Sequence, residues 1–443
     1  MRNAAGARHV GTLAEPMPSS FPAIRDRAPF TWGMVFLLLF TLVAVGRIQE
    51  VLPALAPLRI GLVTGGLALL AWVIAPGSLW DKIPLEIKQA RYVLILLGLG
   101  IVTVPLSVWP RRSFEFVTEK YWKTILLFLL VIFWSRSLQD MRRLVWVCCL
   151  GMAGLVILGL LTGEMGGARF NAESETYDAN DLAMLLVMVL PLVLYLFSTS
   201  GVILRIALLG MASACLYGVV LTRSRGGLLA LLVVGALILW QSALSRTTKV
   251  LVTGIALLVF GGLAGSDYWE RMEAIWDPKT ELERTGTGRT EVWKTGLVLM
   301  ATHPWGVGIN GFEIAEGLSH GGEGRWKAAH NSFLQVGVDL GVAGLAVFLM
   351  MFALTIKELR RIRGVVPATT EHSRLKNVIS LAAALEISLW GFIVGGFFLS
   401  QAYSGLLYIV FALSVACIRL AMPCRTTEEQ RSGGIVYGHT GSS

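Results

Sequence analysis

"LAMLLVMVLPLVLYLFSTSGVIL", residues 182–204, is an uninterrupted run without a single charged side chain. As a helix, this run is long enough to cross the hydrocarbon core of a bilayer, which is about 30 Å thick. Of the 443 residues in the chain, 55% are hydrophobic and only 15% are charged, and the mean hydropathy is +0.66. These values are far from those of a soluble enzyme. The sequence therefore predicts an all-α, polytopic membrane protein.

Similar runs recur along the chain and predict about 12 transmembrane helices. The long run Ile387–Ile418 is divided into two helices by the turn-forming residues SQAYSG at 400–405. A weaker span, Lys120–Ser135, requires its two lysines to extend toward the membrane surface. The other predicted spans are Ala28–Gly46, Ile60–Trp80, Tyr92–Pro110, Leu144–Gly163, Leu182–Leu204, Ile206–Thr222, Gly226–Ser245, Val250–Ser266 and Leu340–Ile356.

The distribution of Lys and Arg predicts the orientation of the chain in the membrane. With an even number of spans, the positive-inside rule places both termini in the cytoplasm. The polar N-terminal segment is too long for a signal peptide, so we expect an uncleaved anchor. The predicted divisions are a cytoplasmic segment 1–28, transmembrane helices 1–9 within 29–265, a periplasmic loop cap 266–331, transmembrane helices 10–12 within 332–420 and a disordered cytoplasmic tail 421–443.

Charge, cysteine usage and motifs exclude several other classes of protein. The net charge of +9 follows from membrane topology, and the chain has no soluble basic domain that would bind nucleic acid. It contains no Walker-type loop and no Rossmann glycine pattern, so we expect no cofactor. All five cysteines fall in predicted helices or the tail, which implies no disulfide framework. They are Cys148, Cys149, Cys215, Cys417 and Cys424.

The long segment 266–331 interrupts the series of helices and short loops, and a loop of this length is usually functional or disordered. Its aromatic and apolar residues argue against disorder. Within it, RTEVWKTGLVLMATH at 289–303 has helical spacing, and Pro304 should end that helix. A glycine-rich turn precedes the helix at 285–288, and a turn-rich run follows at 305–312. We therefore expect a small helical cap on the outer membrane face.

Two arginines stand in the short outer turn TRSRGG, residues 222–227. One interpretation makes Arg223 and Arg225 interfacial anchors for lipid phosphates. The other makes them ligands of a bound anion, because arginine stays charged and donates two parallel hydrogen bonds to a phosphate. Arg289, in the first turn of the predicted loop helix, is either a solvated charge or a third ligand aided by the helix N-terminus.

A histidine marks the end of the loop in GEGRWKAAHNSFLQVGVDLGVAGLAVF, residues 322–348. His330 lies where the polar loop gives way to a hydrophobic helix. A lone histidine at such a place often has only a structural hydrogen bond. An imidazole, with a reference pKa near 6.5, also accepts a proton from a hydroxyl near neutral pH, which contributes roughly 10² to 10⁴ in rate.

Acidic residues offer two further candidates. The outer segment Gly163–Asp181 is rich in carboxylates, and those between Glu173 and Asp181 could hold a divalent metal. Their spacing matches no strong metal-ligand pattern, however, so a solvated surface loop is the favoured interpretation. Glu386 is expected to lie mid-helix, where an acid within the membrane is either functional or hydrogen-bonded within the bundle. Neither pattern predicts a metal site.

Four short motifs, in order along the chain, resemble the O-antigen ligase family of bacterial inner-membrane glycosyltransferases. They are TRSRGG at 222–227, Gly288-Arg289 followed by Trp293, HPWGVG at 303–308 and HNSFL at 330–334. The resemblance covers roughly residues 165–355, including the order of helices and one large periplasmic loop. It implies a GT-C-like architecture.

The resemblance implies transfer of a polysaccharide from undecaprenyl diphosphate to a hydroxyl of lipid A-core, at the periplasmic face and within a membrane of lipid partners. By this resemblance Arg225, Arg289 and His330 are expected to be catalytic, without a metal ion. The expected substrate-binding residues are Arg223, Asn331, Trp293 and Trp305. Asn331 is also expected to orient the histidine. In this hypothesis His330 activates the acceptor hydroxyl, and the two catalytic arginines stabilise the leaving diphosphate.

Other functions fit the same architecture. O-antigen polymerases and protein O-oligosaccharyltransferases use the same donor with a glycan or protein acceptor. The polymerases often have an arginine followed eleven positions later by glycine, which the loop arginines here lack, and the oligosaccharyltransferases usually have a soluble C-terminal part. A polysaccharide or lipid exporter, in which the arginines guide anionic head groups, is a different class that would perform no glycosidic chemistry.

Overall fold

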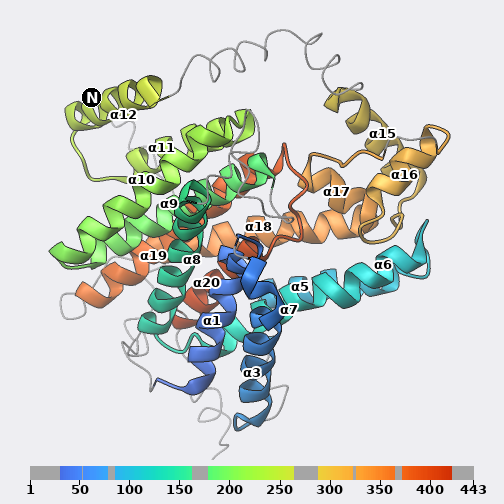
Figure 1. The fold of residues 1–443 in the computed structure, drawn as a ribbon, viewed down its shortest axis with the longest axis horizontal. Helices are drawn as coiled ribbons and strands as arrows, with labels where there is room; N and C mark the ends of the chain where they lie inside the picture. The colour runs from blue at the N-terminus through green and yellow to red at the C-terminus, as the bar shows by residue number, and fades with distance from the viewer. Residues whose placement is uncertain are drawn as a thin grey trace, which may run out of the picture.

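The computed structural model describes residues 30–51, 53–77, 85–161, 178–263, 288–322, 326–364 and 372–421. Within these ranges the chain forms helices and no β-strand, in agreement with the predicted all-α class (Figure 1). Predictions for segments 1–28, 163–177, 264–287 and 422–443 lie outside the described residues.

The helices of the first half are α1 (Trp32–Gly46), α2 (Ile48–Val51), η1 (Pro53–Leu58), α3 (Ile60–Ile74), α5 (Lys88–Val102), α6 (Pro110–Phe116), the π-helical turn η2 (Val117–Tyr121), α7 (Trp122–Trp134), α8 (Leu138–Leu161), α9 (Ala179–Thr199) and α10 (Val202–Thr222). The helices of the second half are α11 (Arg225–Gln241), α12 (Arg246–Leu263), α15 (Arg289–Thr302), α16 (Phe312–Ser319), α17 (Ser332–Asp339), α18 (Gly341–Arg363), α19 (His372–Gly396) and α20 (Gly405–Ala421).

Six helical segments among the described residues are long and apolar enough to cross a membrane. They are Ala54–Ile74, Leu138–Leu161, Ala179–Thr199, Val202–Thr222, Gly341–Arg363 and Leu375–Gly396. Three shorter apolar helices are α1, α11 and α20. A helix occupies part of each predicted span, and the number of about 12 crossings stays a prediction. The turn predicted within Ile387–Ile418 is confirmed, because α19 ends at Gly396 and α20 begins at Gly405.

Several predicted boundaries were wrong. The span predicted at Tyr92–Pro110 is α5, which begins at Lys88 and ends at Val102. Pro105 explains the early end, because proline disfavours helical geometry in the preceding residue and cannot donate a backbone hydrogen bond. The segment Lys120–Ser135 continues backward through η2 and α6, so helical structure extends from Pro110 to Trp134.

Helix α9 lies inside the bundle, with 15 of its 21 residues buried. It packs against α8, α10, α11 and α19 (Figure 1). At its start, the Asp178 carboxylate accepts the backbone N–H groups of Asn180 and Asp181 at 2.7 and 2.8 Å. Asp178 and Asp181 together form a capping box, so these two members of the acidic segment begin a helix.

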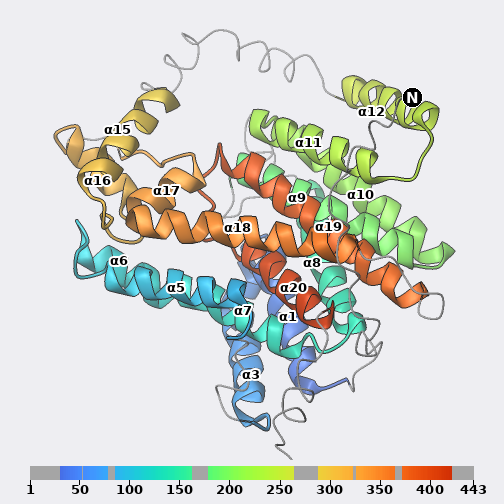
Figure 2. The ribbon, with the colours of Figure 1, turned by 180° about the vertical axis from the view of Figure 1, so that it is seen from behind.

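The predicted helical cap is present in the described part of the loop. The helix predicted at 289–303 is α15, and it ends at Thr302, just before Pro304. Helices α15, α16 and α17 lie together at one end of α18, with α6 nearby (Figure 2). Arg112 of α6 joins Glu313 of α16 through an ion pair of 2.6 Å.

The cap has a small core of its own, and its members come from all three cap helices and from the loops between them. This core contains Val292, Leu299, Val307, Phe312, Ala315, Ala329, Leu334 and Val338.

The membrane span after the loop begins at Gly341, one residue after the predicted start at Leu340. The short helix α17 ends at Asp339, and α18 begins at Gly341, whose φ of +74° is in the left-handed region. The loop after α15 docks at this break, because Val307 and Gly308 donate to the carbonyls of Val338 and Asp339, and Val342 donates to Pro304. The short helix α17 therefore separates His330 from the span, in place of a direct loop-to-span junction.

Glu386 is an ion-pair partner at the predicted cytoplasmic side. Its carboxylate, only 2% exposed, accepts a hydrogen bond of 2.7 Å from Arg360 and a second one from Arg363. The pair connects α18 to α19, which favours the structural interpretation of this acid. Four cysteines, Cys148, Cys149, Cys215 and Cys417, are buried within helices and free, and Cys424 lies outside the described residues.

Candidate functional site

The turn between α10 and α11 presents the first two arginines. Arg223 ends α10 with φ of +50°, a left-handed conformation that is uncommon for a residue with a side chain. Ser224 is buried, and its hydroxyl accepts the Gly227 N–H at 3.1 Å, which starts α11 at Arg225. A Cβ at Gly227 would overlap the Cβ of Ala183, so glycine lets α11 approach α9 closely. Both arginine side chains are half-buried beside this turn.

Helix α15 brings Arg289 and Trp293 to the cap. Arg289 is the first residue of the helix and is half-buried. Trp293 lies one turn later, and its indole N–H donates to the Ala329 carbonyl oxygen at 3.0 Å. The residue next to His330 is therefore tied to the helix that carries Arg289.

His330 is held by the loop between α19 and α20. Its backbone has φ of +44°, and its N–H donates to the Ser400 hydroxyl oxygen at 2.8 Å. Two residues later, the Ser332 hydroxyl donates to the Leu399 carbonyl at 2.6 Å and accepts the Gln401 N–H at 3.0 Å. Non-glycine residues in the left-handed region cost of order 1 kcal/mol and cluster at functional sites. The histidine conformation thus depends on residues 70 positions away in sequence.

The segment 397–400 contacts all three parts of the predicted site. The Trp293 ring lies against the rings of Phe397 and Phe398, with centroids 5.3 and 6.5 Å apart. A Cβ at Gly226, directly after Arg225, would lie 3.3 Å from the Phe398 Cβ. Together with the bond from His330 to Ser400, these contacts bring the elements carrying Arg225, Arg289 and His330 around one short loop.

The Phe397–Ser400 loop was not among the predicted site residues, although the turn at 400–405 was recognised. A polar turn within a long apolar run, at the same predicted membrane face as the arginines, is the signal that would have found it.

Two of the predicted substrate-binding residues, Asn331 and Trp305, do not have the expected place beside His330: one caps a helix and the other lies at the far end of that helix. The Asn331 Oδ1 atom accepts the N–H groups of Phe333 and Leu334, both at 3.0 Å, so this side chain caps α17 instead of orienting His330. Trp305 is 77% exposed and adjoins Gly341, beyond the C-terminal end of α17. Because α17 has eight residues, Trp305 is separated from His330 by about 12 Å of helix.

A buried carboxylate that was not predicted from the sequence, Asp339, holds together the end of α17, the start of α16 and the α19–α20 loop. Asp339 accepts the N–H groups of Asn310, Gly311 and Phe312 and the hydroxyl of Tyr403, at 2.9 to 3.1 Å. Burial raises the pKa of its carboxyl to about 7, and these four donors oppose the increase. An aspartate directly before an apolar span, in VGVDLGV, was the available signal.

A second acidic side chain reaches the same loop. The Asp181 carboxylate accepts a hydrogen bond from the side chain of Gln401, which follows Ser400. The α19–α20 loop is thereby joined to α9 and α17, and through Tyr403 to the cap.

Residues 210–349 match the model of the family described as O-antigen ligase. The match places an O-antigen ligase domain in residues 210–349, less than half of the chain. The domain match begins in α10 and ends in α18, so it contains Arg223, Arg225, Arg289 and His330, whereas the Phe397–Ser400 loop lies outside it. No curated protein matches the chain.

The O-antigen ligase domain defines a class of chemistry. Proteins of this family have glycosyltransferase-type activity in O-antigen processing and act on a lipid-linked polysaccharide. The domain match and the six helices suited to crossing a bilayer within the described ranges together support a multi-pass membrane protein of lipopolysaccharide biosynthesis.

Proposed function

We propose that this protein is an inverting glycosyltransferase that moves O-antigen polysaccharide from undecaprenyl diphosphate to a hydroxyl of lipid A-core. The reaction takes place at the periplasmic face of the bacterial inner membrane and uses no metal ion. One observation carries the proposal: the elements that bear Arg225, Arg289 and His330 all pack around the Phe397–Ser400 loop.

The transfer is a single displacement at the anomeric carbon of the donor sugar. The acceptor oxygen forms the new glycosidic bond as the bond from the anomeric carbon to the phosphate oxygen breaks. His330 accepts the proton of the acceptor hydroxyl, and the undecaprenyl diphosphate leaves with the electron pair of the broken bond. Attack from the side opposite the diphosphate inverts the anomeric configuration.

The arginines act on the leaving group. Negative charge accumulates on the diphosphate in the transition state, and fixed guanidinium groups in a partly buried site stabilise it more than water does. Arg225 and Arg289 are both half-buried, and each stands at a helix start, where backbone N–H groups add to the attraction. Arg223 assists from the same turn.

The acceptor distinguishes this function from its alternatives. A polymerase would join the glycan to a second lipid-linked glycan, and a protein O-oligosaccharyltransferase would join it to a protein hydroxyl. Purified protein should therefore be incubated with a lipid-linked glycan and each of the three acceptors in turn. We expect only lipid A-core to gain the polymer, measured by gel mobility, with release of undecaprenyl diphosphate measured by mass spectrometry.

Variants then test the catalytic roles in the same assay. His330→Ala, Arg225→Gln and Arg289→Gln should each reduce transfer by about 10² or more while the thermal midpoint stays near that of the wild type. Arg111→Gln is the matched control, because Arg111 is an exposed arginine of α6 paired only locally with Glu115. Addition of EDTA should leave transfer intact.

Three results would contradict the proposal. Full transfer by His330→Ala would remove the histidine from the mechanism. Loss of transfer with EDTA, restored by a divalent metal, would refute metal independence. Movement of glycan across a membrane without any new glycosidic bond would favour the exporter.

A further inference from the structure

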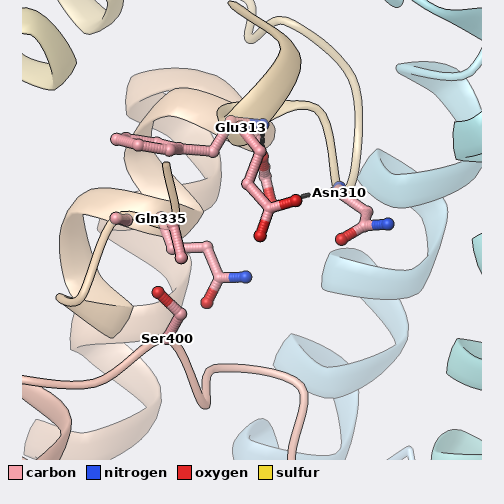
Figure 3. Close-up of a pocket in the computed structure, with 8 residues that line it drawn as sticks. Asn310, Glu313, Gln335 and Ser400 are labelled. Atoms are coloured by element: carbon pink, nitrogen blue, oxygen red, sulfur yellow. Dashed lines mark hydrogen bonds between the residues drawn. The ribbon is translucent and has the colours of Figure 1, made fainter. Parts of the chain in front are cut away.

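A small polar pocket adjoins the segment that carries His330, because Ala328 and Ala329 line it. It is lined by Asn310, Phe312, Glu313, Ala328, Ala329, Gln335, Asp339 and Ser400. In Figure 3 the side chains of Asn310, Glu313 and Gln335 extend into a common space, with Ser400 next to Gln335. Two lining residues, Ala329 and Ser400, also hold His330 in the predicted site. The pocket and the catalytic segment thus share a wall.

Two of the polar side chains that line the pocket, Glu313 and Asp339, are carboxylates, and the other three, Asn310, Gln335 and Ser400, can each donate or accept a hydrogen bond. The Gln335 Oε1 atom is buried and has no hydrogen-bond partner within the described part of the chain. Glu313 is paired with Arg112 and keeps 38% of its side chain exposed, and Asp339 also lines the pocket. A buried acceptor without a partner is costly and calls for a donor. An anion such as a diphosphate would be repelled by this set of oxygens.

The size of the pocket limits which chemical group can bind there. Its cavity volume is about 20 Å³, which accommodates one water-sized group. A single hydroxyl group fits that space and supplies the missing donor. The pocket therefore differs in charge and in scale from the arginine side, where a diphosphate belongs.

We propose that this pocket binds one hydroxyl group of the acceptor sugar, next to the hydroxyl that reacts. The inference rests on the proposed function, because it assumes a carbohydrate acceptor at His330. In this arrangement the acceptor sugar donates its hydroxyl proton in a hydrogen bond to Gln335 Oε1, which fixes the ring relative to the histidine. Gln335 is then a positioning residue that discriminates among acceptors.

The test compares Gln335→Met with the wild type in purified, full-length protein. Methionine has a similar length but accepts hydrogen bonds poorly, so packing is retained and the acceptor atom is lost. We expect the KM for lipid A-core to rise about tenfold, with much smaller changes in kcat and in the KM for the lipid-linked donor. Gln241→Met is the matched control, because Gln241 also has a buried Oε1 without a partner in the described structure, at the opposite end of α11 from Arg225.

Acceptors that each lack one hydroxyl complete a double-mutant cycle. One deoxy acceptor should show a raised KM with the wild type and no further increase with Gln335→Met. If every deoxy acceptor responds equally in both proteins, or if the acceptor KM of Gln335→Met equals that of the wild type, the pocket holds only water and the inference is wrong. Absence of transfer by the wild-type protein would instead refute the proposed function.

Discussion

The backbone N–H of His330 donates a 2.8 Å hydrogen bond to the hydroxyl oxygen of Ser400, which joins the fourth sequence motif to the loop between α19 and α20. The bond supports a left-handed histidine backbone with φ of +44°. The position of the imidazole therefore depends on a serine outside the matched domain.

Ser400→Ala should lower kcat because it removes this support for the histidine backbone. One hydrogen bond contributes about 1 kcal/mol, so we expect a decrease of roughly fivefold to tenfold in glycan transfer. Ser400→Thr should restore activity, since it keeps the hydroxyl. Ser404→Ala is the control in the same loop, because the Ser404 hydroxyl is buried without a partner in the described structure. Wild-type kcat in Ser400→Ala would contradict the prediction.

Asp339 should make stability depend on pH. Its pKa in the folded protein is about 7, above the ordinary value near 3.9, so the folded state binds the proton more tightly than the unfolded state. The resulting contribution, at most about 4 kcal/mol, is complete below about pH 4 and is lost as the pH rises through 7. We expect the thermal midpoint in detergent to fall between pH 5 and pH 8.

Asp339→Asn supplies the comparison for that measurement. The asparagine does not titrate, so the variant should begin with a lower thermal midpoint and show a flatter profile between pH 5 and pH 8. Asp140→Asn, at a buried aspartate paired with Arg143, is the matched substitution in another part of the bundle. An identical slope in the Asp339→Asn variant would assign the pH dependence to other groups.

Glu386→Gln should destabilise the bundle without affecting chemistry. Loss of the carboxylate charge weakens the ion pairs with Arg360 and Arg363 between α18 and α19. Arg360 is more than half exposed, so we expect a cost of about 1 to 3 kcal/mol, below that of a fully buried pair. Thermal unfolding should show the loss, while transfer per folded molecule stays constant. Glu358→Gln, on the same helix as the two arginines, is the control, and a large loss of kcat in Glu386→Gln would indicate a functional role.

Gly341→Ala should disrupt the junction between the cap and the membrane span. Its φ of +74° disfavours any side chain, and a Cβ there would overlap the Pro304 carbonyl oxygen. We expect a loss of about 2 to 4 kcal/mol in thermal unfolding. Gly154→Ala in α8 is the matched control, because a Cβ at Gly154 would meet no packed neighbour within 4 Å. That helical change should stabilise by about 0.5 to 1 kcal/mol, and equal effects of the two changes would contradict the strain at Gly341.

The sequence by itself determined the helical class, most helix positions and the loop helix after Gly288. Apolar runs without charge leave the backbone few alternatives to a helix in a bilayer, and proline and glycine mark the ends of elements locally. Motif order also selected Arg225, Arg289 and His330, which fall within the matched domain. These features depend on neighbours in sequence or on residue type alone.

Tertiary structure decided the features that depend on residues far apart in the chain. The capping role of Asn331, the pairing of Glu386 with α18 and the Asp339 bonds to Tyr403 all required distant segments to meet. Local composition could identify a polar residue in an apolar run but not its partner, because many donors compete until the helices pack. The role of the Phe397–Ser400 loop could not be predicted from the sequence either, because its contacts with Gly226, Trp293 and His330 exist only in the folded bundle.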